Sequence, residues 1–183
     1  MSGEVGPVSG DQEQALTALL AARGGALHGY AVTLCRDEAL ARDLVQDALV
    51  GVLSRRSGAD DIIKLEAYLK SAMVRRYVDL ARRRRRWAQI RHLVVRRSEI
   101  ESFDRGVELR LDLDRALTEL SPQQRAVVIR FYYDDEPITR IAAELGCSIG
   151  SVKRYLSDAR ARLAMLVRDE TRATEGVAGH ADT

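Results

Sequence analysis

Apolar residues recur three and four positions apart along most of this chain, and no segment sustains the two-residue alternation of a half-buried strand. Aromatic residues are 5% of the sequence, so any core must consist mainly of aliphatic side chains, and Ala, Leu and Arg all favour helix. The pattern therefore predicts an all-α protein. The length of 183 residues is enough for one or two domains.

The first half of the chain predicts a helical domain at 12–87, after a Gly/Ser/Pro-rich segment, 1–11, that we expect to be disordered. Gly24-Gly25 is expected to end one helix, and Asp37 to cap the N-terminus of another. Helices are thus expected at about 11–22, from about Leu27, from Asp37 to about Arg56 and at 64–86, with a loop at 57–61.

A second helical domain is predicted at 109–168. Residues 88–108 lie between the two domains and lack a clean apolar stripe, so they are predicted to be a linker, basic in its first half and acidic in its second. The tail, 169–183, also lacks apolar periodicity and is predicted to be disordered.

The second domain contains a helix-turn-helix pattern. Ser121-Pro122 followed by Gln124 has the signature of a capping box at the start of a helix that ends at 134–137. Gly146 supplies the positive φ that a tight turn between helices 138–145 and 149–167 needs. Ser148 is placed to cap the second of these helices.

The outer face of the last helix suits DNA. Short polar and cationic side chains near a helix N-terminus fit the major groove, where Arg and Lys reach phosphates or guanine edges. The outward residues are Ser151, Lys153, Arg154, Ser157, Asp158 and Arg160. An ordinary helical hairpin with a solvated face is the alternative.

Arginine is concentrated in one segment. From Arg75 to Arg97 the chain carries ten arginines and one acid, Asp79, a local charge of +9 in a chain of net charge +2, so the remainder carries −7. A basic stripe in an otherwise acidic chain predicts a polyanionic partner at one place. The alternative for the run Arg82 to Arg86 is a solvated helix C-terminus, where cations complement the helix dipole.

Two smaller features have ordinary explanations when composition alone is considered. Asp43, Gln46 and Asp47 form a polar patch opposite an apolar face, which favours a plain solvated surface. Tyr68 and Tyr77 have helical spacings that favour core packing over base stacking.

The sequence excludes several classes of function. No stretch approaches the ~20 apolar residues that span a bilayer, and the N-terminus lacks a signal peptide's basic and apolar regions. Two cysteines and three scattered histidines match no disulfide framework or metal site. No nucleophile, phosphate-loop or metalloprotease motif occurs. We therefore expect a non-enzymatic, cytoplasmic protein without metal or cofactor.

Two blocks of sequence resemble the extracytoplasmic-function (ECF) group of bacterial RNA polymerase sigma factors. RDEALARDLVQDALV at 36–50, followed by YVDLARRRRR at 77–86, is similar to sigma region two. LTELSPQQRAVVIRFYYDDEPITRIAAELGCSIGSVKRYLSDARARL at 117–163 is similar to region four. With their intervals, the blocks cover nearly all of 12–167.

The resemblance implies a division of labour. Region two would bind core RNA polymerase, on its largest subunit, and capture the melted minus-ten promoter element; region four would bind the minus-thirty-five duplex and contact the second-largest subunit. An inhibitory anti-sigma factor would be a further partner. The implied polymerase-binding residues are Asp43, Gln46 and Asp47. The implied minus-ten residues are Lys64, Tyr68, Arg75, Arg76, Arg82 and Arg83, and the implied minus-thirty-five residues are Arg140, Ser148, Ser151, Lys153, Arg154 and Ser157.

The chain departs from the family at several positions. Before the helix-turn-helix, Glu136-Pro137-Ile138-Thr139 replaces the family's usual Leu-Ser-rich entry. In the first domain, the family often has Asn where Arg75 stands and Trp where Tyr68 stands. We therefore expect the melted strand to be captured through different contacts.

Two rival functions stay open on sequence alone. A free-standing helix-turn-helix regulator would bind a palindrome with half-sites about one helical turn apart. A helical interaction protein would use the arginine stripe to bind an acidic protein surface and would have no affinity for DNA.

Overall fold

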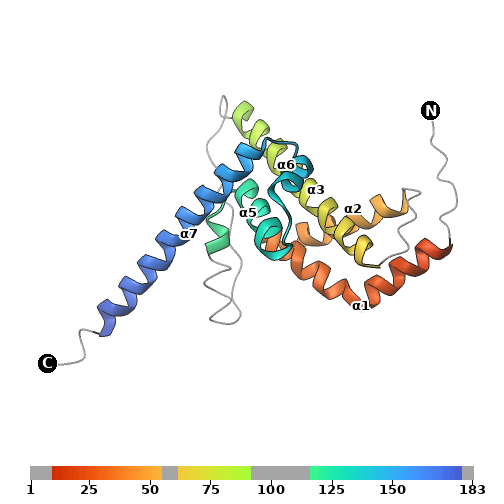
Figure 1. Cartoon of the computed structure of the whole chain (residues 1–183), viewed down its shortest axis with the longest axis horizontal. Coiled ribbons are helices and arrows are strands. Elements are labelled where there is room, and N and C mark those ends of the chain that lie inside the picture. Colours follow the sequence, from red (N-terminus) through yellow and green to blue (C-terminus); the bar gives the residue numbers. More distant parts are fainter. Residues whose placement is uncertain (1–9, 55–61, 92–115, 179–183) are drawn as a thin grey trace. The chain divides into compact units, whose positions relative to one another are not determined.

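The computed structural model describes residues 10–54, 62–91 and 116–178, and every regular element in these ranges is a helix, which confirms the predicted fold class. The chain divides into two compact units, one within Met1–Phe103 and one within Asp104–Thr183. The first contains α1 (Gly10–Cys35), α2 (Glu38–Leu53) and α3 (Ile62–Arg91) (Figure 1). The second contains α5 (Pro122–Val128), the π-helical turn η1 (Ile129–Tyr133), α6 (Ile138–Leu145) and α7 (Ile149–Ala178).

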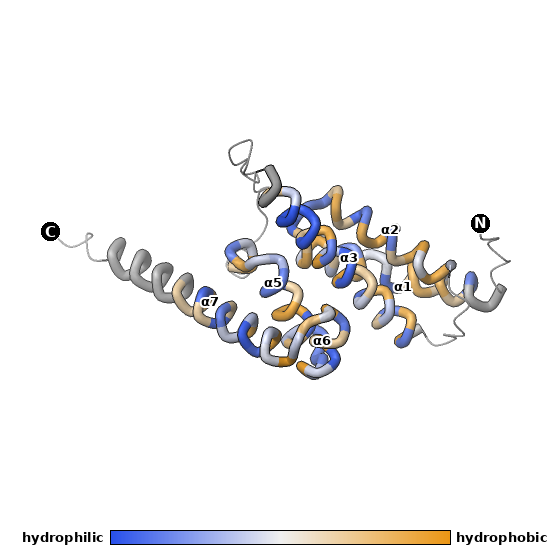
Figure 2. The backbone as a smooth tube through the Cα atoms, turned by 90° about the horizontal axis from the view of Figure 1, so that it is seen from above, coloured by the Kyte–Doolittle hydropathy of each residue, from blue (hydrophilic) through white to orange (hydrophobic). Residues whose placement is uncertain are grey.

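Each helix of the first unit packs against the other two. Figure 2 shows hydrophobic and hydrophilic residues interspersed along these three helices. The most deeply buried side chains are mainly aliphatic: Leu19, Leu27 and Leu34 from α1, Ala41 and Leu44 from α2, and Leu69, Met73, Val74 and Val78 from α3. Burying one such leucine contributes about 1.5–3 kcal/mol, so this core accounts for the stability of the unit.

Helix α1 runs without interruption through Gly24-Gly25, so the prediction that these glycines end a helix is wrong. Leu19 and Leu27 are buried on either side of the pair. Their burial outweighs the ~0.5–1 kcal/mol that each glycine costs in a helix interior. The helix bends along its length in Figure 1 instead of breaking.

The turn from α1 to α2 is held by backbone conformation and a side-chain cap. Arg36 adopts the left-handed conformation, with φ at 58°, and its amide donates to the carbonyl of Val32 at 2.7 Å. The carboxylate of Asp37 accepts from the amide of Leu40 at 2.8 Å, which confirms the predicted cap. These bonds satisfy backbone groups that helix ends leave without a helical partner.

Glu66 on α3 ties α1 to α3. Its carboxylate lies 3.2 Å from Arg23 Nε on α1 and 3.3 Å from Lys70 Nζ one turn further along α3. Burial alone would raise the pKa of Glu66, but hydrogen bonds from Arg23 and Lys70, with their positive charges, hold that pKa below its ordinary value.

In the second unit, local sequence signals determine the helix ends. The predicted capping box is present: Ser121 Oγ accepts from the Gln124 amide at 3.3 Å, and Gln124 Oε1 accepts from the Ser121 amide at 2.9 Å. Gly146 has φ at 58°, as predicted, and Ser148 Oγ accepts from the Ser151 amide at 3.1 Å. Helices α6 and α7 therefore form a helix-turn-helix.

Several element bounds differ from the predictions. Helix α2 ends at Leu53, before Arg56. Helix α1 begins at Gly10, inside the segment 1–11 that was predicted to be disordered. Helix α3 continues through 88–91, the start of the predicted linker, and α7 continues to Ala178, well into the predicted tail. Both extensions are free of proline and contain Ala and Arg, which favour helix.

Some predictions lie outside the described residues. These are the loop at 57–61, the linker from 92 onward and the end of the tail from 179.

We expect alanine to have opposite effects at two kinds of glycine. Gly24→Ala and Gly25→Ala should each raise the free energy of unfolding by about 0.5–1 kcal/mol, because the new methyl groups meet no atom within 4 Å and the sites are helical. Gly146→Ala should lower it by about 1–2 kcal/mol, because φ there is +58°. Urea denaturation followed by circular dichroism measures these changes, and the same sign at all three positions would contradict the assignment.

Glu66→Gln should destabilise the first unit at neutral pH, by an amount that shrinks in acid. The pKa of Glu66 is lowered from 4.5 by folding, so its stabilising contribution is present above that value and is lost as the pH falls through the folded value. Melting temperatures of the variant and the natural chain, compared from about pH 7 to about pH 3, measure the effect. A difference that does not change with pH would show that the carboxylate is not the cause.

Candidate nucleic-acid interface

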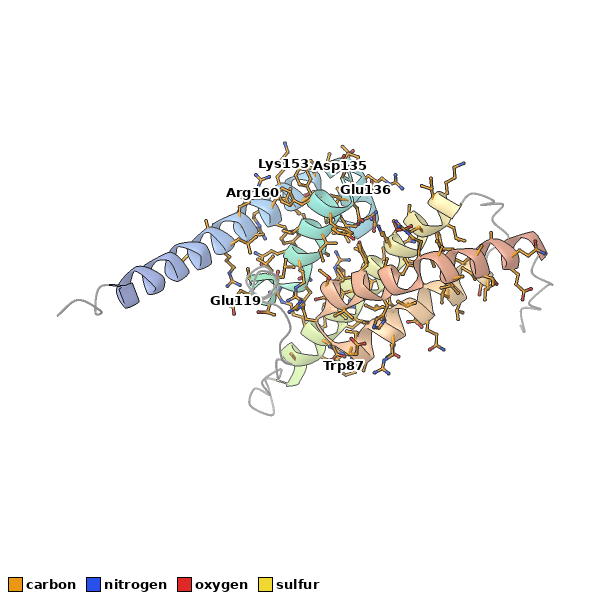
Figure 3. The ribbon with its side chains drawn as sticks, turned by 90° about the horizontal axis from the view of Figure 1, so that it is seen from below. Trp87, Glu119, Asp135, Glu136, Lys153 and Arg160 are labelled. Carbon is orange, nitrogen blue, oxygen red and sulfur yellow. The ribbon has the colours of Figure 1, made fainter. Side chains whose placement is uncertain are left out.

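The C-terminal part of α3 carries an exposed basic surface. Arg83, Arg84, Arg85 and Arg86 are all exposed. Arg82 lies partly buried, with its Nη1 3.6 Å from the carboxylate of Asp79. Trp87, next in sequence, is 66% exposed and is labelled in Figure 3. This surface therefore combines several cations with one aromatic ring, as proteins that bind nucleic acid do.

Three of the other minus-ten candidates make intramolecular contacts. Arg75 is partly buried and its Nε donates to the Ser71 carbonyl within α3 at 3.3 Å. Arg76 Nε donates to Asp47 Oδ2 on α2 at 2.7 Å. Tyr68 is partly buried, with its hydroxyl 3.9 Å from where a Cβ at Gly51 would lie. Lys64 is exposed.

The predicted polar patch on α2 exists as an exposed surface. Asp43, Gln46 and Asp47 are exposed, whereas Leu44 and Ala48 between and beside them are buried. Because Asp47 pairs with Arg76, this patch is in direct contact with α3. The structure thus brings together two residues that the sequence assigned to different ligands.

The helix-turn-helix presents its cations to solvent. Lys153, Arg154 and Ser157 are exposed on α7, and Arg140 is exposed on α6. Ser148 and Ser151 instead bond to each other, Oγ to Oγ at 2.9 Å, and Ser148 also caps α7. These two serines therefore stabilise the N-terminus of α7, the helix that carries Lys153, Arg154 and Ser157.

A buried arginine in the second unit was not identified from the sequence. Arg130 on η1 is 1% exposed, and its guanidinium lies 2.8 Å from Asp134, 3.4 Å from Glu136 and 2.8 Å from Glu144 on α6. A buried charge needs such partners, because removal from water costs several kcal/mol. One signal was available: Arg130 stands inside the apolar run VVIRFYY and has an acid four residues later.

The buried cluster extends to the surface through Glu136. One carboxylate oxygen of Glu136 faces Arg130, and the other lies 3.3 Å from Nε of Arg140. Arg140 is 60% exposed at the side chain and was predicted to contact DNA. Figure 3 shows Glu136 and Asp135 in the segment before α6, and Lys153 and Arg160 on α7. Glu136 therefore holds a candidate phosphate contact at the start of the helix-turn-helix.

Two further arginines are held by neighbours that the sequence did not indicate. Arg125 on α5 is buried and donates to the carbonyls of Leu117, Thr118 and Leu120, which closes the preceding turn. Arg160 Nε on α7 donates to the hydroxyl of Tyr132 on η1 at 2.7 Å. Arg160 thus has a fixed orientation on the same exposed helix as Lys153 and Arg154.

Among the described residues, no three His, Cys, Asp or Glu side chains are placed to hold a metal ion. The helices in this part of the chain also include none that is both long and apolar enough to cross a membrane.

Two family descriptions match the chain in order. Residues 19–87 match sigma-70 region 2, and residues 110–163 match sigma-70 region 4. The first match spans α2 and most of α1 and α3, including the basic surface. The second spans the helix-turn-helix and the Arg130 cluster.

Individual proteins are similar over most of their length. The RNA polymerase sigma-E factor of Streptomyces avermitilis is 33% identical over 141 residues, which is 77% of this chain and 78% of the relative. The sigma-E factor of Streptomyces coelicolor is 31% identical over 84% of this chain and 88% of its own length. The ECF RNA polymerase sigma factor SigL of Mycobacterium tuberculosis is 28% identical over 84% of this chain and 89% of its own length.

A solved structure has the same kind of fold. The sigma factor RpoE of Bartonella quintana, crystallised in complex with the anti-sigma factor NepR, superposes with a TM-score of 0.57 at 30% identity. The alignment covers 86% of this chain and 97% of that one.

Arg130→Met should destabilise the second unit by about 3–5 kcal/mol, because it leaves three carboxylates without their buried cation while keeping most of the side-chain volume. Arg140→Ala removes an exposed partner of the same Glu136 and should change stability by less than about 1 kcal/mol. Chemical denaturation of both variants measures the contrast. Equal effects would show that the buried cluster contributes no more than a surface ion pair.

Proposed function

This chain belongs to the ECF group of the sigma-70 family, whose regions 2 and 4 recognise the minus-ten and minus-thirty-five promoter elements during initiation, and we propose how its own residues divide that work. It is a sigma factor and not an enzyme. The observation that carries the proposal is the presence of both regions, in order, on two helical units. A free-standing helix-turn-helix regulator would not need the first region.

We place polymerase binding on the exposed patch of α2. Asp43, Gln46 and Asp47 offer carboxylate and amide oxygens on a helix whose opposite side is buried in the unit's core. Such a surface complements cationic side chains of a partner. The proposed partner is the largest subunit of core polymerase, and the second-largest subunit is proposed to contact the second unit.

We assign the minus-ten element to α3. Lys64, Arg82 and Arg83 are accessible cations, and Arg76 becomes accessible when its pair with Asp47 opens. Tyr68 and Arg75 are partly buried and have intramolecular neighbours, so we propose that they position the exposed residues of α3 and do not themselves contact DNA.

We assign the minus-thirty-five element to the exposed side of α7 and the start of α6. Lys153, Arg154 and Ser157 are proposed to contact base edges and phosphates in the major groove. Arg140, oriented by Glu136, is proposed to contact a phosphate, while Ser148 and Ser151 fix the N-terminus of α7. The catalytic step of RNA synthesis belongs to the polymerase.

Two further proposals follow from the partners. The structural relative RpoE is bound to an anti-sigma factor, which supports an inhibitory partner for this chain as well. The cytoplasm is the proposed location, because the polymerase and promoter DNA that the protein is proposed to bind act there.

The proposed domain limits are 12–87 and 109–168, with 88–108 as the linker and 1–11 and 169–183 as terminal segments. Helices α1, α3 and α7 extend into three of these segments.

The experiment that tests the proposed function is transcription in vitro with purified core polymerase and a genomic promoter library. The chain should co-elute with core polymerase and direct initiation from a defined subset of templates. Arg154→Ala should reduce initiation by weakening upstream recognition while leaving co-elution intact. A chain that neither joins the polymerase nor directs initiation from any template would overturn the proposal.

Replacing both acids of the α2 patch, Asp43→Ala with Asp47→Ala, should weaken binding to core polymerase by about tenfold, because two complementary charges are lost from the interface. The affinity is measured by titrating labelled core polymerase.

The matched control for this prediction is Arg76→Ala, which breaks the same Asp47–Arg76 ion pair but keeps both carboxylates. It should not weaken polymerase binding and should strengthen it by at most about fivefold, because Asp47 no longer has to leave Arg76. An equal loss with Arg76→Ala would mean that the ion pair, and not the acidic patch, accounts for the effect.

A further inference from the structure

The first unit has few aromatic rings that could stack on a base. Residues 1–91 contain four aromatic residues: Tyr30, Tyr68, Tyr77 and Trp87. Tyr30 and Tyr77 are 4% and 6% exposed, and Tyr68 is partly buried beside Gly51. Trp87 is 66% exposed, so among the described residues of this unit it is the ring that presents a broad face to solvent.

Exposed cations surround Trp87. Arg83 and Arg84 precede it by four and three residues, which places them on the adjacent turn of the same helix surface. Side chains on a helix lean toward its N-terminus, so the indole of Trp87 covers the turn from which these two arginines extend. Arg86, the preceding residue, is also exposed.

This combination selects a ligand with negative charges at short intervals and free aromatic faces. Single-stranded nucleic acid has both, because its phosphates bind arginine and its unstacked bases stack on aromatic side chains. In a duplex the base faces are covered by neighbouring bases, so a duplex would contact the arginines but offer no free base face for Trp87 to stack on. A membrane surface fits less well, because the apolar side of α3, with Leu69, Met73 and Val74, is buried in the core.

We propose that Trp87 stacks on an unpaired base of the melted promoter strand while Arg83, Arg84 and Arg86 bind the adjoining phosphates. This inference rests on the proposed function, since it gives the minus-ten unit a capture point. Arg83 belongs to both this capture point and the set that the family resemblance implies, but the aromatic residue differs, because the resemblance implies Tyr68. Tyr68 lies nineteen residues earlier on α3, which at about 1.5 Å per residue is about 28 Å along the helix. The strand is therefore held at the C-terminal end of α3, where the natural chain places an exposed ring.

The chain contains a single tryptophan, so its fluorescence reports on this residue alone. In the first experiment, the full-length chain is titrated with an oligothymidylate and, separately, with an abasic oligonucleotide of equal length and charge. Oligothymidylate should quench the emission through stacking, and the abasic strand should not. Equal quenching by both strands, or none by oligothymidylate, would overturn the proposal.

Variants separate stacking from charge. Trp87→Ala should weaken oligothymidylate binding at least fivefold, as expected for one lost base–aromatic stack, and Trp87→Phe should restore part of the affinity. The matched control is Val50→Ala, which shortens another exposed apolar side chain of the same unit, on α2, and should leave the affinity unchanged. Unchanged binding by Trp87→Ala would overturn the proposal.

The holoenzyme distinguishes this proposal from the proposed function. Polymerase carrying Trp87→Ala should assemble normally and form fewer open complexes, measured by permanganate reactivity of unpaired thymines, and Trp87→Phe should recover part of the signal. If the natural chain directs initiation and Trp87→Ala opens promoters equally well, the function stands and the stacking role fails. If the natural chain directs no initiation, the proposed function itself fails, whatever the oligonucleotide titrations show.

Discussion

The guanidinium of Arg130 fixes the geometry on which DNA recognition by the second unit depends. It joins η1, the segment before α6 and α6 itself through three carboxylates. A cluster of this kind contributes little net stability, because burying the charges costs about as much as their attraction returns. Its hydrogen bonds are directional, however, so α6 cannot rotate or slide without breaking them. With α6 fixed, the left-handed Gly146 and the Ser148 cap determine where α7 begins.

The first unit is organised differently. Its three helices pack mainly through aliphatic side chains, and the ion pairs that join them lie at or near the surface. Arg83 to Arg86 are exposed at the end of α3, and this helix can carry five consecutive cations because its apolar side is already buried. The same chain thus uses buried charge to fix a helix-turn-helix and exposed charge to bind a polyanion.

Local features of the fold could be predicted from the sequence, and distant ones could not. The caps at Asp37, Ser121 and Ser148 each depend on a residue three positions away, and Gly146 on its own backbone conformation, so short motifs were sufficient. The prediction at Gly24-Gly25 failed because α1 is held by packing against α2 and α3 through leucines on either side of the pair, and this packing outweighs local propensity. Arg130 meets Glu144 fourteen residues away, and Asp47 meets Arg76 twenty-nine residues away, and no periodicity shows such pairs. The exposure of Trp87 likewise depends on α3 continuing past its packed part. The sequence pattern predicts that this helix ends at residue 86, whereas α3 continues to Arg91.

The Asp47–Arg76 pair limits how the two binding surfaces of the first unit can influence each other. In the proposed assignment, polymerase takes Asp47 and DNA takes Arg76, so either ligand releases the other's residue, and the coupling must be reciprocal. Both side chains are roughly half exposed, and such a pair contributes at most about 1 kcal/mol, which corresponds to about fivefold in affinity. This is too small to make promoter binding depend strongly on polymerase. A stronger dependence would have to come from holding two separate DNA-binding units on one complex, where the second contact forms at a high effective concentration.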